Sequence, residues 1–262
     1  MRTIVAGAVI LAVAVLMTMT GRGGGNFYVP ILVAAGERMH EAATSGQFIL
    51  MATAFAGMLV FHKHKRVDWK LALVIDPPTD IMALVGGYYA HMVSGPTLKF
   101  VMAGLLVVAS ICMVFKPKDR PIGEGRLGFW RRRFNGEEYV VNLWLAIPIT
   151  AAVGLVAGAV GISGGSFKVP LMVLLCGVPM HIAVGTSSAM VAVTALMGFV
   201  GHAGAGDFSP SWAIPIAGLA VVGGLVGGKL ALKTKAKKLK LLFAFTTLAA
   251  ACFMGVNAWL TR

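Results

Sequence analysis

Apolar residues gather in long runs that are interrupted by glycine-rich breaks or short basic segments. Most runs are close to the ~20 residues with which an α-helix crosses a bilayer. They cover about residues 3–20, 41–61, 69–91, 97–115, 141–160, 181–201, 212–232 and 238–259. Two shorter apolar pieces, 27–35 and 167–177, each follow a glycine-rich break. The pattern predicts an all-α polytopic membrane protein with two short helices that begin inside breaks.

The two glycine-rich breaks are copies of one another. Gly21–Pro30 aligns without a gap to Gly161–Pro170 at an offset of 140, and six of the ten positions are identical. The correspondence continues at an offset of 141, where Gly86-Gly87 matches Gly227-Gly228. We therefore predict a duplication, with one transmembrane repeat over 1–115 and a second over 141–262. The first run follows Arg2 in the manner of a signal peptide, but its counterpart, 141–160, is internal, so both are taken as structural helices.

Composition places the chain in the membrane class. Hydrophobic residues make up 58% of the chain and charged residues 13%, and the mean hydropathy is +0.83. A soluble fold needs more charge to cover its surface. The net charge of +13 does not indicate nucleic-acid binding, because the cations lie between the apolar runs, as they do in membrane proteins. The three cysteines are too scattered for a disulfide framework or a metal site, and no cofactor is predicted.

Residues 116–140 form the only substantial polar segment, and we interpret them as a basic cytoplasmic linker between the repeats. If each repeat crosses the membrane an odd number of times, the basic segments 62–66, 116–133 and 233–238 all face the cytoplasm, as the positive-inside rule requires. Arg2 alone would then lie outside. The odd count arises if each opening run and its short helix form a glycine-broken hairpin, followed by about three spanning helices. The repeats would then be inverted, as in many secondary transporters of the cell inner membrane.

The glycine-rich breaks carry the chemistry of an anion site. A helix that begins after the glycines, at Phe27 or Phe167, presents N–H groups and a partial positive charge at its start. Asn26 and Ser166 stand where an N-cap would, and the prolines that follow fall in the first turn. The alternative is that the glycines serve close helix packing, as Gly154-x-x-x-Gly158 and Gly224-x-x-x-Gly228 are expected to do. A nucleotide-binding loop is not indicated, because no Lys-Ser/Thr pair follows the glycines.

A polar cluster opens the helix after each break. The predicted substrate-binding residues are those of the breaks and these clusters: Gly24, Gly25, Asn26, Phe27, Thr44, Ser45, Gln47, Gly164, Gly165, Ser166, Phe167, Thr186, Ser187 and Ser188. Hydroxyls in apolar helices also bond to the carbonyl four residues earlier, and that reading stays open. His40 and His181 precede their helices and serve either as caps or as a proton-sensitive gate.

Charged residues inside the apolar runs and the breaks are few, and four of them are candidates for a functional role. Asp76 and Asp80 flank Pro77-Pro78, where they either form an intramembrane gate or proton-coupling site or mark a helix end at an interface. Lys168 and Arg22 lie in the breaks and either pair with a substrate anion or extend to the surface. Tyr28 occupies the position of Lys168 in the first repeat.

These motifs resemble those of the TauE/SafE family of membrane permeases, the sulfite exporter or sulfonate permease group. The family pattern, Gly-x-Gly-Gly-Gly to Val-Pro and then His-x-Ala-x-Gly-Thr-Ser, is matched by Gly161–Pro170 and by His181–Ser187. The first repeat matches more loosely through Gly21–Pro30 and His40–Ser45. Two departures from the family pattern are Ser163 in the second repeat and Thr44-Ser45 in the first. The resemblance spans nearly the whole chain and implies transport of sulfur-containing or organic anions, coupled to protons or another gradient.

The sequence therefore predicts a non-enzymatic secondary transporter of small anions such as sulfite, sulfoacetate or thiosulfate, which works by alternating access where the two broken helices meet. No paired acid and base or metal spacing supports an enzyme. A membrane assembly protein that binds a partner, or an anion channel, remains the alternative. The sequence leaves the oligomeric state open.

Overall fold

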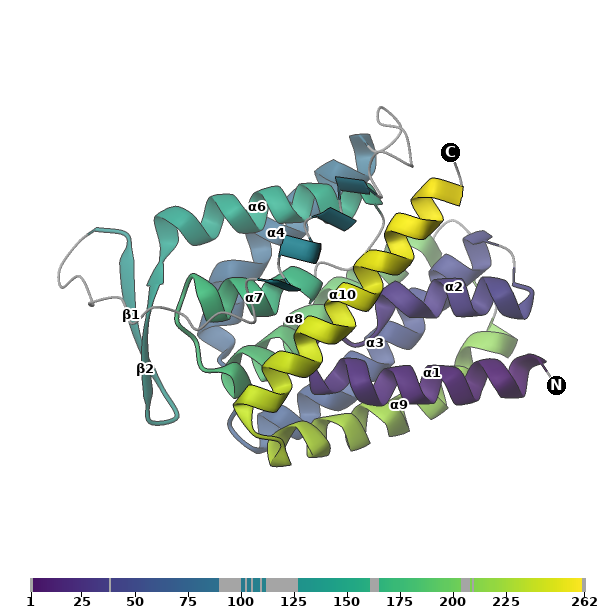
Figure 1. Ribbon diagram of the computed structural model, residues 1–262, viewed down its shortest axis with the longest axis horizontal. Coiled ribbons are helices and arrows are strands. Elements are labelled where there is room, and N and C mark those ends of the chain that lie inside the picture. Colours follow the sequence, from purple (N-terminus) through teal and green to yellow (C-terminus); the bar gives the residue numbers. More distant parts are fainter. Residues whose placement is uncertain are drawn as a thin grey trace. The chain divides into compact units, whose positions relative to one another are not determined.

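The chain is mostly helical (Figure 1). The computed structural model describes residues 2–37, 39–89, 100–101, 103–104, 106–108, 110–111, 127–160, 165–203, 208 and 210–260. Its elements are α1 (Arg2–Met19), α2 (Gly25–Ala35), α3 (Met39–Lys63), α4 (Trp69–Tyr89), β1 (Phe129–Phe134), β2 (Glu137–Asn142), α6 (Leu143–Val160), α7 (Gly165–Leu174), α8 (Met180–Ala203), α9 (Pro210–Lys233) and α10 (Ala236–Leu260). Most predicted apolar runs thus form a helix, and the described residues between 100 and 111 are helical as well.

Within the described residues, three helical stretches are long and apolar enough to cross a membrane. They are Thr44–Lys63, Met180–Val200 and Pro210–Lys233. Shorter apolar helices cover Val5–Met19, Leu143–Val156 and Gly165–Leu174. The length and composition of these helices agree with the predicted helical membrane protein.

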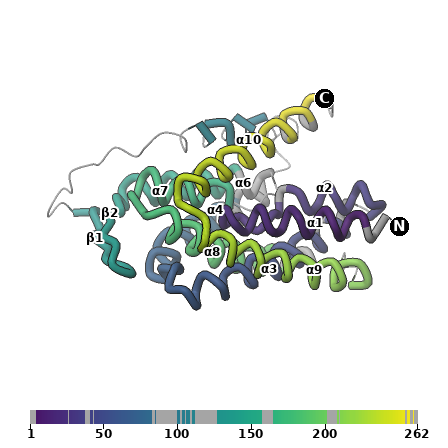
Figure 2. The backbone as a smooth tube through the Cα atoms, turned by 60° about the horizontal axis from the view of Figure 1, so that its bottom comes forward, coloured from purple at the N-terminus to yellow at the C-terminus, as the bar shows by residue number. Residues whose placement is uncertain are grey.

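The chain divides into two compact units, each of which takes segments from both halves of the sequence. Unit 1 is Met1–Val67 with Val184–Lys235, and unit 2 is Asp68–Ala183 with Ala236–Arg262. In unit 1, α9 packs along both α1 and α3, and α1 runs beside α9 in Figure 2. In unit 2, α4 packs along α6. Under the offset of 141, the α4–α6 pair is the counterpart of the α9–α1 pair.

Small residues allow the backbones of these paired helices to approach closely. A Cβ added at Gly224 of α9 would meet the carbonyl oxygen of Thr53 in α3 at 2.5 Å. One added at Gly154 of α6 would collide with the backbone of Thr79 in α4. These two glycines therefore have the packing role that the sequence assigned to them.

A glycine turn ends α1 and starts α2. Gly21 and Gly24 have φ of 76° and 102°, in the left-handed region that favours glycine. A Cβ at Gly21 would also meet the carbonyl oxygen of Val184 at 2.5 Å, so the turn lies directly against the backbone of α8. Both conformational freedom and close approach thus require glycine here.

The predicted starts and caps of the short helices are wrong. α2 and α7 begin at Gly25 and Gly165, two residues before Phe27 and Phe167. The N-cap of α2 is Gly24, which makes no side-chain cap hydrogen bond, and Asn26 and Ser166 are already helical. The left-handed Gly24 supplies the sharp turn, so the next glycine can adopt helical angles. The prolines consequently lie beyond the first turn.

A β-hairpin begins within the segment interpreted as a basic cytoplasmic linker and extends to Asn142. β1 and β2 pair antiparallel, with Arg132 opposite Tyr139, and the helix expected from residue 141 begins at Leu143 (Figure 1). Asn135 and Gly136 at the tip have φ of 50° and 81°, as a two-residue hairpin turn requires. The Asn-Gly pair between two β-prone runs was the sequence signal for this hairpin, and it corrects the all-helical expectation.

Candidate functional site

The break of the first repeat holds a buried cation in unit 1. Arg22 lies in the turn between α1 and α2 and is only 4% exposed. Its Nη2 lies 3.5 Å from the sulfur of Met17. Ser187 of α8 donates a hydrogen bond of 2.8 Å to the carbonyl of Gly21, next to Arg22. The fold therefore brings the polar cluster of the second repeat onto the break of the first.

Unit 1 holds many serine and threonine side chains that are buried in these elements. They are Thr18, Thr20, Thr44, Ser45, Thr53, Thr186, Ser187 and Ser188. Ser187 and Ser188 do not bond to their own helix: Ser188 donates to the carbonyl of Ala54 in α3 at 3.2 Å. A hydroxyl has one hydrogen to donate, so in this conformation both serines hold α8 to its neighbours rather than offering a donor to an anion.

The start of α2 is occupied by contacts of the protein itself. The Phe27 N–H donates to the Gly24 carbonyl at 3.0 Å. The Tyr28 hydroxyl donates to Oγ1 of Thr53 at 3.3 Å, and Tyr28 is fully buried. Gln47 is half-buried, and its amide lies against Gly198 of α8. The turn therefore positions Arg22, while the N–H of Phe27 belongs to the helix.

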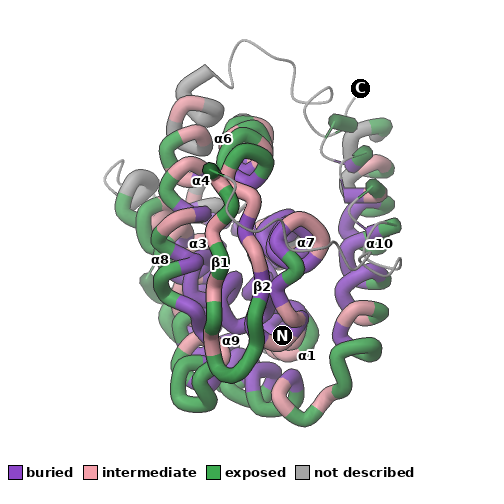
Figure 3. The backbone as a smooth tube through the Cα atoms, turned by 90° about the vertical axis from the view of Figure 1, so that its left-hand side faces the viewer, coloured by how far each residue is buried: buried purple, intermediate pink, exposed green. Residues whose placement is uncertain are grey.

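Unit 2 carries the second buried cation. α7 is buried from Gly165 to Val173, and Figure 3 shows most of this helix in the buried class. The Lys168 ammonium forms an ion pair with the carboxylate of Asp76 on α4. The two residues are 3% and 7% exposed. Asp80, one turn further along α4, is half-buried. The structure thus joins two predicted residues that the sequence could not connect.

The remaining predicted residues are placed in part. Ser166 and Phe167 are buried in α7, and His181 is half-buried in the first turn of α8. The side chains of Asn26 and His40 and the whole of Gly164 lie outside the described residues. Among the residues that the structure describes, no group of three His, Cys, Asp or Glu side chains is arranged to hold a metal ion.

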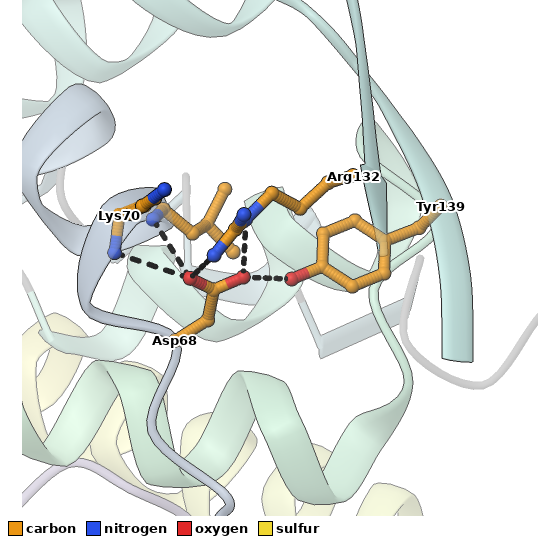
Figure 4. Close-up of polar contacts among 5 residues, drawn as sticks. Asp68, Lys70, Arg132 and Tyr139 are labelled. Atoms are coloured by element: carbon orange, nitrogen blue, oxygen red, sulfur yellow. Dashed lines mark hydrogen bonds and ion pairs between the residues drawn. The ribbon is translucent and has the colours of Figure 1, made fainter. Parts of the chain in front are cut away.

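A polar network at the start of α4 was not predicted (Figure 4). The Asp68 carboxylate accepts hydrogen bonds from Arg132 at 2.7 and 2.9 Å, from the Tyr139 hydroxyl, and from the backbone N–H groups of Lys70 and Leu71 at 3.1 and 3.2 Å. Asp68 thus caps α4 and fastens the hairpin to it. An aspartate one residue before Trp69, where an apolar run begins, was the only sequence signal.

Hydrogen bonding sets the ionisation of this network. Burial alone would raise the pKa of Asp68, but the bonds from Arg132, Tyr139 and the backbone outweigh burial and hold that pKa below its usual value. The same contacts raise the pKa of Arg132. Burial, and then the neighbouring carboxylate, raise the pKa of Tyr139 well above its usual value. The network is therefore one of structural charges and does not titrate near neutral pH.

Comparison with known proteins gives the chain its class. The chain is 25% identical over 247 residues to a probable membrane transporter protein, YunE, of Bacillus subtilis strain 168, over 90% of each chain. It is 35% identical over 86 residues to a second probable membrane transporter of that organism, YdhB, over 33% of this chain and 35% of the relative. No solved structure matches it. A family model described as sulfite exporter TauE/SafE matches residues 6–254. The chain therefore belongs to the sulfite exporter TauE/SafE family and is a membrane transporter rather than an enzyme.

Proposed function

We propose that this transporter is a secondary carrier of small anions, most specifically of sulfur-containing oxyanions, and that it works by alternating access. The observation that carries this proposal is that each glycine-rich break buries one cation, Arg22 in unit 1 and Lys168 in unit 2. Both breaks lie between apolar helices of a membrane protein. Cations buried among membrane-spanning helices cost free energy and commonly mark the path of a substrate or ion.

The two cations suit different parts of an oxyanion. The planar Arg22 guanidinium can donate two parallel hydrogen bonds to two oxygens of one sulfite or sulfonate group. The Lys168 ammonium acts as a compact point charge. The matching family model, named for sulfite export, supports a sulfur oxyanion over other anions. Chloride is a single atom and cannot present two oxygens to the guanidinium.

The packing of the helices supports two related repeats. α1 packs on α9 in unit 1, and their counterparts α6 and α4 pack on each other in unit 2. Each unit thus pairs the first helix of one repeat with the fourth element of the other. Exchange of this kind is what an inverted pair with a shared substrate path requires. Inversion of the repeats, and a substrate path where the broken helices meet, stay part of the proposal.

The proposed orientation places the basic segments 62–66, 116–133 and 233–238 in the cytoplasm and the chain in the inner membrane. A test replaces exposed Cys252 by serine and introduces Lys65→Cys or Lys235→Cys. A maleimide that cannot cross the membrane is expected to label either cysteine only after the cells are permeabilised. Labelling of intact cells at either position would overturn this orientation.

Binding of anions to the purified protein tests the proposed function. Thermal unfolding in detergent is measured with sulfite, sulfate, thiosulfate, a short sulfonate, acetate and chloride at matched ionic strength. A ligand at ~100 times its dissociation constant adds about 2.7 kcal/mol to the free energy of unfolding. We expect sulfur oxyanions to raise the unfolding temperature in the wild type and in the control Lys235→Gln, and not in Arg22→Gln.

Flux measurements separate the carrier from its alternatives. Proteoliposomes are expected to take up the stabilising anion at a rate that saturates with its concentration. A rate that rises linearly with concentration would indicate a channel. Absence of uptake, together with no selective stabilisation by any anion, would favour a membrane assembly protein.

A further inference from the structure

A buried ion pair joins the break of the second repeat to α4. Lys168 lies in the first turn of α7, and its ammonium contacts the carboxylate of Asp76. Both side chains lie within unit 2, so the contact belongs to a single compact part of the molecule. Asp76 directly precedes Pro77-Pro78, and Lys168 lies two residues before Pro170. Prolines cannot donate to the carbonyl four residues earlier, so both helices have weakened backbone bonding beside the pair.

Unit 1 has no charge at either equivalent position. The counterpart of Lys168 is Tyr28 at the offset of 140, and the counterpart of Asp76 is Ala217 at the offset of 141. Tyr28 and Ala217 both belong to one buried hydrophobic cluster in unit 1. Packing at these positions is therefore met by apolar contact in unit 1. Because a buried ion pair is often no more stable than well-packed apolar residues, stability alone does not explain the pair in unit 2.

We propose that Asp76 is a proton-controlled competitor of the substrate anion for Lys168. This inference rests on the proposed anion transport. When Asp76 is ionised, its carboxylate occupies the ammonium. When Asp76 takes up a proton, the pair loses its negative partner, and the oxyanion replaces the carboxylate at Lys168. One proton and one negative charge then enter together and leave together, so a monovalent anion moves with a proton without net charge.

Few other groups compete for this role. On α4 the other titratable residues are Lys70 near the start, Asp80 one turn beyond Asp76, and Tyr88 and Tyr89 at the far end. α6, which packs along α4, has none in its sequence, and Lys168 is the only one on α7. Asp80 is close enough for its charge to act on Asp76. It belongs to the electrostatic surroundings of the pair, and Asp76 is the residue whose carboxylate forms the ion pair with the Lys168 ammonium.

The test measures proton and anion movement in the same proteoliposomes, with a pH dye trapped inside. In the wild type we expect an imposed proton gradient to drive uphill uptake of sulfite, with about one proton entering for each monovalent anion. Asp76→Asn imitates the protonated carboxyl. It is expected to exchange sulfite across the membrane at a rate independent of pH but to lose uphill uptake. Lys168→Gln is expected to bind sulfite about 10- to 100-fold more weakly. Glu138→Gln, which neutralises an exposed carboxylate of the hairpin in the same unit, is the control and is expected to keep uphill uptake.

The outcomes separate this inference from the proposed function. Wild-type uptake of sulfite without proton movement would overturn the role of Asp76 and leave anion transport standing. The same result follows if folded Asp76→Asn keeps proton-driven uptake. A wild-type protein that moves none of the tested anions would overturn the proposed function, and this inference with it. The wild-type dye measurement needs no variant, so it can overturn the role of Asp76 even if Asp76→Asn fails to fold.

Discussion

The two units place different chemistry at one position of the repeat. In unit 1 the position holds Tyr28, whose neutral hydroxyl donates to Thr53. In unit 2 it holds Lys168, whose ammonium pairs with Asp76. The lysine and its acid occur together, and their counterparts, tyrosine and Ala217, are both part of an apolar core. A cation was thus accommodated in unit 2 with a compensating anion on a different helix.

The cation of unit 1 lies at a different position of the break. Arg22 corresponds to Ile162 in the second repeat. Each break therefore has one cation, but the two cations occupy different positions of the aligned breaks. The glycine turn that carries Arg22 is held by the backbone of α8. Glycines thus recur at corresponding positions of the two halves of the sequence, whereas the buried charges do not.

The largest effect is expected from breaking the pair in unit 2. Lys168→Met leaves the Asp76 carboxylate buried without its cation, which costs about 3–5 kcal/mol of the free energy of unfolding. Thermal or denaturant unfolding in detergent measures this loss. Combining Lys168→Tyr with Asp76→Ala copies unit 1 and is expected to restore most of the stability. If the double variant is as unstable as Lys168→Met, the two positions are not compensating.

The glycine turn of unit 1 is expected to be next in effect. Gly21→Ala combines a left-handed φ with a collision against the Val184 carbonyl, and we expect a loss of about 2–4 kcal/mol. Gly36→Ala is the matched control, because Gly36 has a φ of 111° but nothing within 4 Å of an added Cβ. It is expected to cost about 1 kcal/mol. Equal losses for the two variants would show that α8 does not press on the turn.

The hairpin network of unit 2 is expected to show a smaller and local effect. Asp68→Asn removes the charge that Arg132 binds, at a cost of about 1.5–3 kcal/mol. Hydrogen exchange of the β1–β2 amides measures whether the hairpin opens. Glu138→Gln, which removes an exposed ion pair with Arg131, is expected to leave exchange unchanged. Unchanged exchange in Asp68→Asn would contradict the fastening role.

The same network gives a pH dependence with a defined sign. The pKa of Asp68 is lower in the folded state than in the unfolded chain, so its contribution to stability is complete above the unfolded value of about 3.9. It is lost as the pH falls through the lower folded value. The protection of the hairpin amides, measured relative to the exchange rate of the unfolded chain at the same pH, should therefore be constant from pH 7 to about 4 and fall only below that. Opening between pH 7 and 5 would contradict this assignment.

The smallest effect on stability is expected at Tyr28, the neutral residue of unit 1 that corresponds to Lys168. Tyr28→Phe removes only the hydrogen bond to Thr53, whose own hydroxyl still donates to the carbonyl of Ile49 at 2.7 Å. We expect a loss of about 1 kcal/mol and unchanged sulfite uptake. A loss of stability as large as that of Lys168→Met would contradict this prediction, because it would show that the Tyr28 hydroxyl matters as much as the buried ion pair of unit 2.

Much of the fold could be predicted from residue patterns. The runs that became α1, α3 and α9 are long and apolar, so burial in a membrane fixes them as helices regardless of partners. The hairpin was missed because the search for apolar runs passed over the Asn135-Gly136 turn and the β-prone residues around it. The helix starts were missed by two residues because glycine permits both turn and helix.

The candidate site could be predicted in composition but not in pairing. Arg22, Lys168 and Asp76 are conspicuous as charges among apolar residues, whatever the fold. That Lys168 meets Asp76 depends on how α4 lies beside α6 and α7, which no local pattern encodes. Ser187 was expected to face a substrate, and its hydrogen bond to Gly21 instead holds two distant segments together. Long-range contacts of this kind come only from tertiary packing.

The most direct test of the account compares sulfite uptake by wild-type proteoliposomes with uptake by the Lys168→Tyr and Asp76→Ala double variant. This variant gives unit 2 the residues that unit 1 already buries in its apolar core, so it is expected to fold. We expect saturable, proton-driven uptake by the wild type and none above empty liposomes by the folded double variant. Equal uptake by the two proteins would contradict it.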